Sequence, residues 1–338
     1  MKTAVFCFSD SGCKLALRLR ELMPDDDISV HTTQKFAPMY NFIGHKSVCA
    51  DIEGLFAEND ALIFICACGI AVRGVAPHLK SKMTDPAVLC IDDRGDHVIP
   101  LLSGHIGGAN SLSLRIATLI GAEPVITTAT DINGKFSCDE WAAEHSCAIS
   151  SMKTAKDVSA VILSSNVGIS SEYKLPDTLP GGLFLSGEGD IGIYIGIKTE
   201  KPYKSTLRLI PRTVTLGIGC RRGVSADDIA AAVSGVLAQN SIDIRAVADI
   251  FSIDVKKDEA GLCGYAESLG VPIGFYSAER LNAIAGEFDE SEFVRRTVGV
   301  GNVCERAAVC GGGRLIIKKT VCGPVTVAAA LNEWSVNF

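Results

Sequence analysis

The chain has 338 residues and a formal net charge of −7, and 47% of its residues are hydrophobic. This length predicts two or three domains, and the apolar content excludes a mainly disordered chain. The acidic balance argues against a general nucleic-acid binder and against adsorption to anionic membranes, and the longest apolar run, residues 61–72, is too short to span a bilayer.

The amino terminus predicts a strand and turn and not a secretory signal, because polar residues from Ser9 onward interrupt a short apolar run. Thirteen cysteines are scattered from Cys7 to Cys322, mostly in apolar runs. We therefore expect reduced, buried thiols and a cytoplasmic protein. The close pair Cys66 and Cys68 lacks the spacing and the second pair of a structural zinc site, so no metal site is predicted.

A short apolar strand, a glycine-containing turn and an amphipathic helix recur along the chain, with strands expected at residues 4–8, 62–66 and 213–218. Strands that alternate with helices predict an α/β fold of several βα units with largely parallel sheets. Residues 87–102 differ, because two apolar runs flank Arg94 and Gly95, which predicts an antiparallel hairpin. A strand is predicted at residues 124–128.

The strand and helix pattern weakens between residues 146 and 201, where short alternating runs indicate a small middle module. Residues 198–212 contain two prolines and five basic side chains, which predicts a connector to the last domain. The predicted domains are an amino-terminal domain at residues 1–135, the middle module at 136–207 and a carboxy-terminal domain at 208–338.

The carboxy-terminal domain has clear helix signals. Ser225 and Asp228 form a capping-box pattern, and a buried stripe is expected along the helix that follows, at Ile229, Ala232, Val233, Val236 and Leu237. The other predicted elements are strands at 249–253 and 271–276, helices at 258–269 (ending at Gly270) and after Ser277, and a final strand at 314–319.

Two candidate sites lie at glycine turns in the first half of the chain. Gly69 and Arg73 follow a strand end, where helix amides and a guanidinium suit a carboxylate or phosphate, although an ordinary βα turn is favoured. The second turn places a histidine among glycines at a helix start, which suits a general base and equally suits a simple corner. Its candidate residues are Ser103, Gly104, His105, Gly107, Gly108 and Asn110.

A third site is indicated by residues 127–141, where hydroxyls, a lysine and carboxylates follow a strand, as in the crevices of α/β sheets. The candidates are Asp131, Lys135 and Glu140. A solvated loop that caps the next helix explains Asp139 better than it explains Asp131 or Lys135.

A fourth site is indicated by residues 217–223, whose glycines resemble a dinucleotide fingerprint with the third glycine one residue late. Two consecutive arginines fit an anion with several charges better than one pyrophosphate. The next predicted strand ends in a charged segment that faces the same crevice or is merely a helix start. The candidate ligand-binding residues are Gly219, Cys220, Arg221, Arg222, Asp254 and Lys256.

These motifs resemble the CbiG family of cobalamin biosynthesis. Residues 69–77, 82–88, 101–110 and 127–136 resemble its amino-terminal domain, and residues 217–223 and 252–256 resemble its carboxy-terminal domain, which is shared with the CobE-type protein. The resemblance implies a cobalt-precorrin 5A hydrolase that opens the δ-lactone and releases acetaldehyde to give cobalt-precorrin 5B. It also implies a tetrapyrrole substrate that carries the cobalt, no protein cofactor, and neighbouring pathway enzymes as partners.

Lactone opening needs a base for water and donors for the developing oxyanion. We assign His105 as the base and the amides of residues 104–108 as donors, with Asp131, Lys135 and Glu140 as further proton-shuttle candidates. The substrate carboxylates are assigned to Arg73, Arg221, Arg222 and Lys256.

The macrocycle is expected in a cleft between the terminal domains, with the carboxy-terminal half binding it and the amino-terminal half doing the chemistry. Two other classes stay open: a tetrapyrrole carrier or chaperone of the same pathway, and a nucleotide-binding enzyme that uses residues 217–223.

Overall fold

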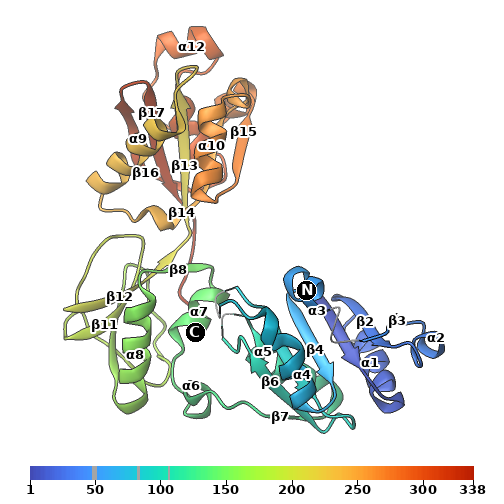
Figure 1. Ribbon diagram of the computed structural model, residues 1–338. Helices are drawn as coiled ribbons and strands as arrows, with labels where there is room; N and C mark the ends of the chain where they lie inside the picture. The colour runs from blue at the N-terminus through green and yellow to red at the C-terminus, as the bar shows by residue number, and fades with distance from the viewer. Residues whose placement is uncertain (48–51, 82–83, 106) are drawn as a thin grey trace. The chain divides into compact units, whose positions relative to one another are not determined.

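The computed structural model describes residues 1–47, 52–81, 84–105 and 107–338 (Figure 1). They form three sheets with mostly parallel pairing, which confirms the predicted α/β class. The chain divides into two compact units, residues 1–140 with one sheet and residues 141–338 with two. No helix in the described ranges is long and apolar enough to cross a membrane.

The sheet of the first unit has the strand order β3-β2-β1-β4-β5-β6-β7. Its strands are β1 (Lys2–Cys7), β2 (Asp27–Thr33), β3 (Ile43–His45), β4 (Ala61–Ile65), β5 (Ala87–Ile91), β6 (His97–Leu102) and β7 (Glu123–Pro124). The helices are α1 (Asp10–Leu22), α2 (Ala37–Tyr40), α3 (Ile52–Glu58), α4 (Cys68–Val75), α5 (Ala109–Ile120), α6 (Ala129–Ile132) and α7 (Cys138–Glu144), which extends past the end of the unit.

Helices cover both faces of this sheet, α1 and α5 on one and α3 and α4 on the other. Strands β4 and β5 are therefore buried along their whole length, which explains why their sequences are continuously apolar.

The predicted hairpin at residues 87–102 is confirmed, because β5 and β6 pair antiparallel and Gly95 adopts φ 74° in the turn. The predicted strand at 124–128 is wrong beyond Pro124. At this sheet edge β7 has a single neighbour, and after Val125 donates to the Val98 carbonyl the chain leaves the sheet.

The reversal at the hairpin sets where the next segments emerge. Because β6 is antiparallel to β5, its end at Leu102 pairs with Val88 at the start of β5, and the segment after β6 emerges where β4 and β5 begin. Strand β7 pairs with the first two residues of β6, and the segment after it comes to the same end of the sheet at Thr128, which contacts Asn110. The two polar segments predicted as candidate sites, at residues 103–110 and 127–141, therefore reach the same end of the sheet.

The second unit begins with a sheet of order β10-β9-β11-β12-β8, packed against α8 (Met152–Ser164). Its strands are β8 (Cys147–Ile149), β9 (Val167–Ser171), β10 (Leu183–Leu185), β11 (Ile191–Ile195) and β12 (Ser205–Pro211). The predicted connector at 198–212 is wrong, because β12 pairs with β11 and β8 and buries Leu207 and Leu209. The predicted boundary between residues 207 and 208 falls inside this strand, and the three-domain division stays a prediction.

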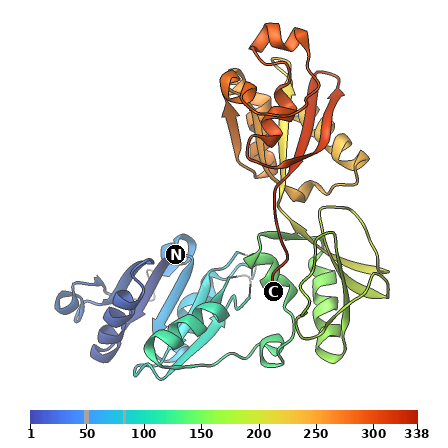
Figure 2. The same cartoon turned by 180° about the vertical axis from the view of Figure 1, so that it is seen from behind.

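The last sheet has the order β15-β14-β13-β17-β16, with α9 and α10 on one face and α13 on the other (Figure 1, Figure 2). Its strands are β13 (Val214–Cys220), β14 (Val247–Ile253), β15 (Ile273–Tyr276), β16 (Arg314–Cys322) and β17 (Val325–Leu331). Its helices are α9 (Ala226–Gln239), α10 (Ala260–Leu269), α11 (Ala278–Asn282), α12 (Glu292–Val298) and α13 (Val303–Val309).

The local helix signals of this part are confirmed. Ser225 Oγ accepts from the Asp228 amide, the predicted apolar stripe of α9 is buried, and Gly270 ends α10 with φ 70°. The strand predicted at residues 314–319 is confirmed as β16, but it is not the final strand. A further strand, β17, follows β16 and inserts between β16 and β13 with antiparallel pairing on both sides.

Candidate active site and ligand pocket

The segment after β6 forms a tight corner that leads into α5. The amides of Ala109 and Asn110 donate to the carbonyls of Ser103 and Gly104, at 3.1 and 2.9 Å. A Cβ at Gly107 would lie 2.3 Å from Ser103 Cβ, and Gly108 adopts φ 76°. These glycines are therefore required by the corner itself.

The corner also limits the predicted oxyanion donors. The amide of Gly108 donates to the His105 carbonyl at 2.9 Å, which removes it from the predicted donor set. Ile106, another residue of that set, lies outside the described residues.

His105 faces a serine and a carboxylate from the segment that follows α6. Its Nδ1 lies 3.4 Å from Ser137 Oγ and 3.4 Å from Asp139 Oδ1, and Ser137 Oγ donates to Asp139 Oδ1 at 2.9 Å. The side chains of His105 and Asp139 are 17% and 14% exposed. A carboxylate beside Nδ1 favours the tautomer with its proton on that nitrogen, which makes Nε2 the basic one.

Asp139 belongs to the first turn of α7, where the sequence explained it as a helix cap. The structure adds the contact with His105, which the sequence analysis missed. Ser137 was missed as well, because its only sequence signal was its place in a polar segment.

Further hydrogen bonds tie this corner to its neighbours. Ser103 Oγ donates to the Asp85 carbonyl at 2.9 Å, and the Asp85 carboxylate accepts from the amides of Lys80 and Ser81. Asn110 is buried and its Nδ2 donates to Thr128 Oγ1 at 3.1 Å. The segments before β5, after β6 and after β7 are thus joined at the end of the sheet where β4 and β5 begin. The crevice rule led us to expect ligands at the opposite end, beyond the carboxyl ends of the parallel strands.

The other predicted residues of this unit have different positions. Glu140 is half-buried in α7 and Lys135 is half-buried just before it. Asp131 lies in α6, and its side chain is outside the described part of the structure. Gly69 lies in the first turn of α4, at the carboxyl end of β4, and Arg73 is exposed in its last turn, so Gly69 is not part of the His105 corner.

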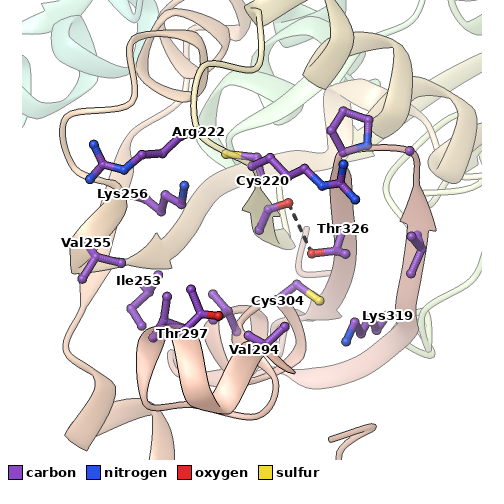
Figure 3. A pocket seen from close by; sticks show the side chains of 17 residues that line it. Cys220, Arg222, Ile253, Val255, Lys256, Val294, Thr297, Cys304, Lys319 and Thr326 are labelled. Carbon is purple, nitrogen blue, oxygen red and sulfur yellow. Dashed lines mark hydrogen bonds between the residues drawn. The ribbon is translucent and has the colours of Figure 1, made fainter. Parts of the chain in front are cut away.

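The last sheet contains a cavity of about 700 Å³ at the ends of β13 and β14 and beside α12 (Figure 3). Its walls are largely apolar, with Ile253, Val255, Val294, Val298, Val303 and Val321. The predicted residues that line it are Gly219, Cys220, Arg221, Arg222 and Lys256. Asp254, which was predicted with them, begins the short 3₁₀ helix Asp254–Lys256 and is not among the lining residues.

One buried carboxylate holds two of the cationic side chains. Glu259 is 8% exposed and accepts from Lys256 Nζ and from the Gly223 amide, both at 3.0 Å, and Arg222 Nε lies 3.8 Å away. The hydrogen bond from Gly223, together with the Lys256 ammonium, lowers the pKa of Glu259. Glu259 therefore stays ionised and fixes this edge of the cavity.

The cavity also contains groups that the sequence analysis missed. Lys319 comes from β16, and Thr326 comes from β17, where its Oγ1 donates to the Gly219 carbonyl at 3.2 Å. Burial raises the pKa of Cys220, and it raises the pKa of Cys304 to about 11, so both are thiols at neutral pH. Thr326 was missed because no sequence signal places β17 beside β13, and Lys319 was missed because β16 joins the sheet through β17.

The cysteines of the described residues have free thiols, five of them buried and the others half-buried, while Cys49 lies outside these residues. Within the same ranges, no group of three or more His, Cys, Asp or Glu side chains is arranged to hold a metal ion.

Two family models match the segments that contain the two candidate sites. A family model described as "Cobalamin synthesis G N-terminal" matches residues 51–131, which include His105, and one described as "Cobalamin synthesis G C-terminus" matches residues 214–330, which include the cavity. Asp139 lies beyond the first match.

Full-length relatives are similar over most of the chain. The chain is 37% identical over 321 residues to the cobalt-precorrin-5A hydrolase of Salmonella typhimurium, with 90% of each protein covered. It is 30% identical over an alignment of 357 residues to the cobalt-precorrin-5A hydrolase of Priestia megaterium, with 97% of this chain and 94% of that protein covered. Protein CobE of a Sinorhizobium species is 35% identical over 124 residues, which cover 35% of this chain and 79% of that protein. The chain therefore belongs to the cobalt-precorrin-5A hydrolase family of cobalamin synthesis proteins.

Proposed function

We propose that this chain is a cobalt-precorrin-5A hydrolase that opens the δ-lactone of its tetrapyrrole substrate and releases acetaldehyde. The substrate class is supported by 37% identity to a relative of that name over 90% of both chains. The observation that carries the proposed chemistry is the contact between His105 Nδ1 and Asp139 Oδ1.

His105 is the proposed general base for lactone opening. With Nδ1 directed to Asp139, Nε2 takes a proton from water, and the resulting hydroxide adds to the lactone carbonyl carbon. The tetrahedral intermediate then expels the alkoxide and leaves a carboxylate. Amides of the corner, at Gly104, His105 and Gly107, are the proposed donors to the oxyanion.

The second step breaks a carbon–carbon bond. The alkoxide forms the C=O bond of acetaldehyde while its bond to the macrocycle breaks, and the electron pair of that bond stays on the electron-poor cobalt macrocycle. The chain then has only to position the substrate and move protons, for which Asp131, Lys135 and Glu140 are proposed. The cobalt enters with the substrate, so the proposal needs no cofactor held by the protein.

The cavity of the second unit is the proposed binding site for the tetrapyrrole. Its apolar walls suit a macrocycle, and Arg221, Arg222 and Lys256 suit peripheral carboxylates. An acidic chain with a net charge of −7 needs such local cations to accept an anionic ligand. Arg73 is exposed and stays proposed for a further carboxylate.

The deciding experiment is anaerobic incubation of the purified full-length protein with cobalt-precorrin 5A, with acetaldehyde and corrinoid mass followed together. Acetaldehyde that rises in step with the loss of a two-carbon unit supports the hydrolase. Tight binding without acetaldehyde would instead favour a carrier or chaperone. Thermal unfolding with and without nucleotides tests the third class, and we expect no shift.

A further inference from the structure

The cavity carries more positive charge than one buried carboxylate can neutralise. Its lining residues in the described chain include four cations, Arg221, Arg222, Lys256 and Lys319, and no acidic side chain. Glu259 contacts Lys256 and Arg222 from behind the lining. A net positive cavity within a chain of net charge −7 indicates an anionic ligand.

The cations occupy two opposite sides of the cavity. Arg222 and Lys256 lie together on one side, next to Glu259, and Lys319 lies on the other side (Figure 3). A nucleotide concentrates its charge on one phosphate chain, which a single cationic side would hold. Charges on two sides of an apolar space fit a flat apolar body with carboxylates on opposite edges.

Glu305 holds the backbone of Lys319 in place, while the side chain of Lys319 can bind a ligand. Its amide donates to Glu305 Oε1 at 2.6 Å, and the buried Glu305 also accepts from Asn302 Nδ2 at 2.7 Å. Across the part of the chain that the structure describes, the Lys319 ammonium forms no ion pair. Glu305 thus holds this point of β16 while the side chain stays available to a ligand.

The neighbouring strand positions supply a natural comparison. Lys318 and Lys319 lie where β16 bulges against β17, because the register shifts between Ile317 and Thr320. Lys319 and Val321 line the cavity, while Lys318 is exposed and does not. Two adjacent lysines of one strand therefore differ in whether they line the cavity.

We propose that Lys319 anchors a peripheral carboxylate of a corrinoid, at the edge opposite the one held by Arg222 and Lys256. Anchors on both edges make the cavity select corrinoids with free carboxylate side chains over corrinoids whose side chains are amides. An amide lacks the charge that makes a hydrogen bond to an ammonium strong. The inference rests on the proposed function for the choice of a corrinoid as ligand.

The test measures equilibrium binding to the full-length protein by calorimetry. The probes are cobyrinic acid, whose side chains are free carboxylates, and cobinamide, in which they are amides. We expect the wild type to prefer cobyrinic acid and Lys319→Met to bind it about 10- to 100-fold more weakly, with little change for cobinamide. Lys318→Met keeps the wild-type affinities, and Lys319→Arg keeps most of the preference because it keeps the charge.

Four results would overturn the inference. Two concern the wild type, which would bind the two probes equally or bind neither. Two concern Lys319→Met, which would bind cobyrinic acid with wild-type affinity or lose affinity for both probes equally. Thermal unfolding of each variant checks that it is folded. Turnover of cobalt-precorrin 5A by the wild type is measured separately. Selective binding without acetaldehyde release rejects only the proposed hydrolase activity. Acetaldehyde release with unselective binding rejects only the inference about Lys319.

Discussion

His105 Nδ1 and Asp139 Oδ1 lie 3.4 Å apart in the first unit, although they come from separate segments that follow β6 and α6. Both side chains are largely withdrawn from water, so solvent screens their contact less than it screens a surface pair. Strand β6, which ends just before His105, begins with a second histidine–carboxylate contact, where His97 Nδ1 lies 3.3 Å from Asp92 Oδ2, with His97 exposed and Asp92 half-buried.

Replacement of His105 tests its role as the base. We expect His105→Gln to lower kcat by about 10²- to 10⁴-fold with a small change in KM, because proton transfer is lost while the corner is kept. The measurement is acetaldehyde release from cobalt-precorrin 5A. His97→Gln removes the pair at the start of β6 and should leave kcat unchanged. A His105 variant that retains most of its turnover would refute the assignment.

Replacement of Asp139 tests whether it positions His105. Asp139→Asn removes the charge that favours the proton on Nδ1, and we expect kcat to fall about 10- to 100-fold, less than the roughly 10⁴-fold loss typical of a short triad contact. KM should stay close to the wild-type value, because the carboxylate is not proposed to touch substrate. Ser137→Ala should cost less than Asp139→Asn, and the reverse order would assign the leading role to the serine.

Gly217 tests the packing of the last sheet. A Cβ at this position of β13 would lie 1.8 Å from the Cys304 carbonyl of α13, so the helix must move. We expect Gly217→Ala to lower the free energy of unfolding by about 1–3 kcal/mol or more in urea denaturation. Gly235→Ala in α9 is the matched control, because no neighbouring atom lies within 4 Å of a Cβ at that position. This substitution should raise the free energy of unfolding by about 0.5–1 kcal/mol. Equal effects of the two substitutions would contradict this packing.

Asp243 predicts a pH dependence of stability. Burial alone would raise the pKa of its carboxyl, but hydrogen bonds from Arg245 and Arg208 outweigh burial and lower the pKa to about 2. A depressed carboxyl pKa stabilises the fold above the unfolded value near 3.8, and this contribution is lost as the pH falls toward 2.

We therefore expect Asp243→Asn to lower the free energy of unfolding by about 1–3 kcal/mol at pH 7, and this deficit to shrink between pH 4 and about 2. Urea denaturation at a series of pH values measures it. Asp258→Asn removes an exposed carboxylate and should change stability little. A deficit for Asp243→Asn that is constant with pH would mean that packing and not charge is responsible.

The sequence by itself determined those features that depend on neighbours within one turn or one βα unit. The cap at Ser225, the buried stripe of α9, the end of α10 at Gly270 and the hairpin at Gly95 all follow from short-range geometry. The candidate residues from Gly219 to Arg222 could be recognised for the same reason, because they are consecutive at the end of β13 and in the turn after it.

The tertiary structure alone decided which distant segments meet. Most of the predicted connector is β12, because burial of Leu207 and Leu209 between neighbouring strands outweighs a proline before the strand and Pro211 at its end. Strand β17 is defined by pairing on both of its sides. Lys319 therefore reaches the cavity, and Asp139 reaches His105 because β6 reverses the chain direction. Sheet pairing is non-local, so a sequence read by local pattern contains no direct record of these contacts.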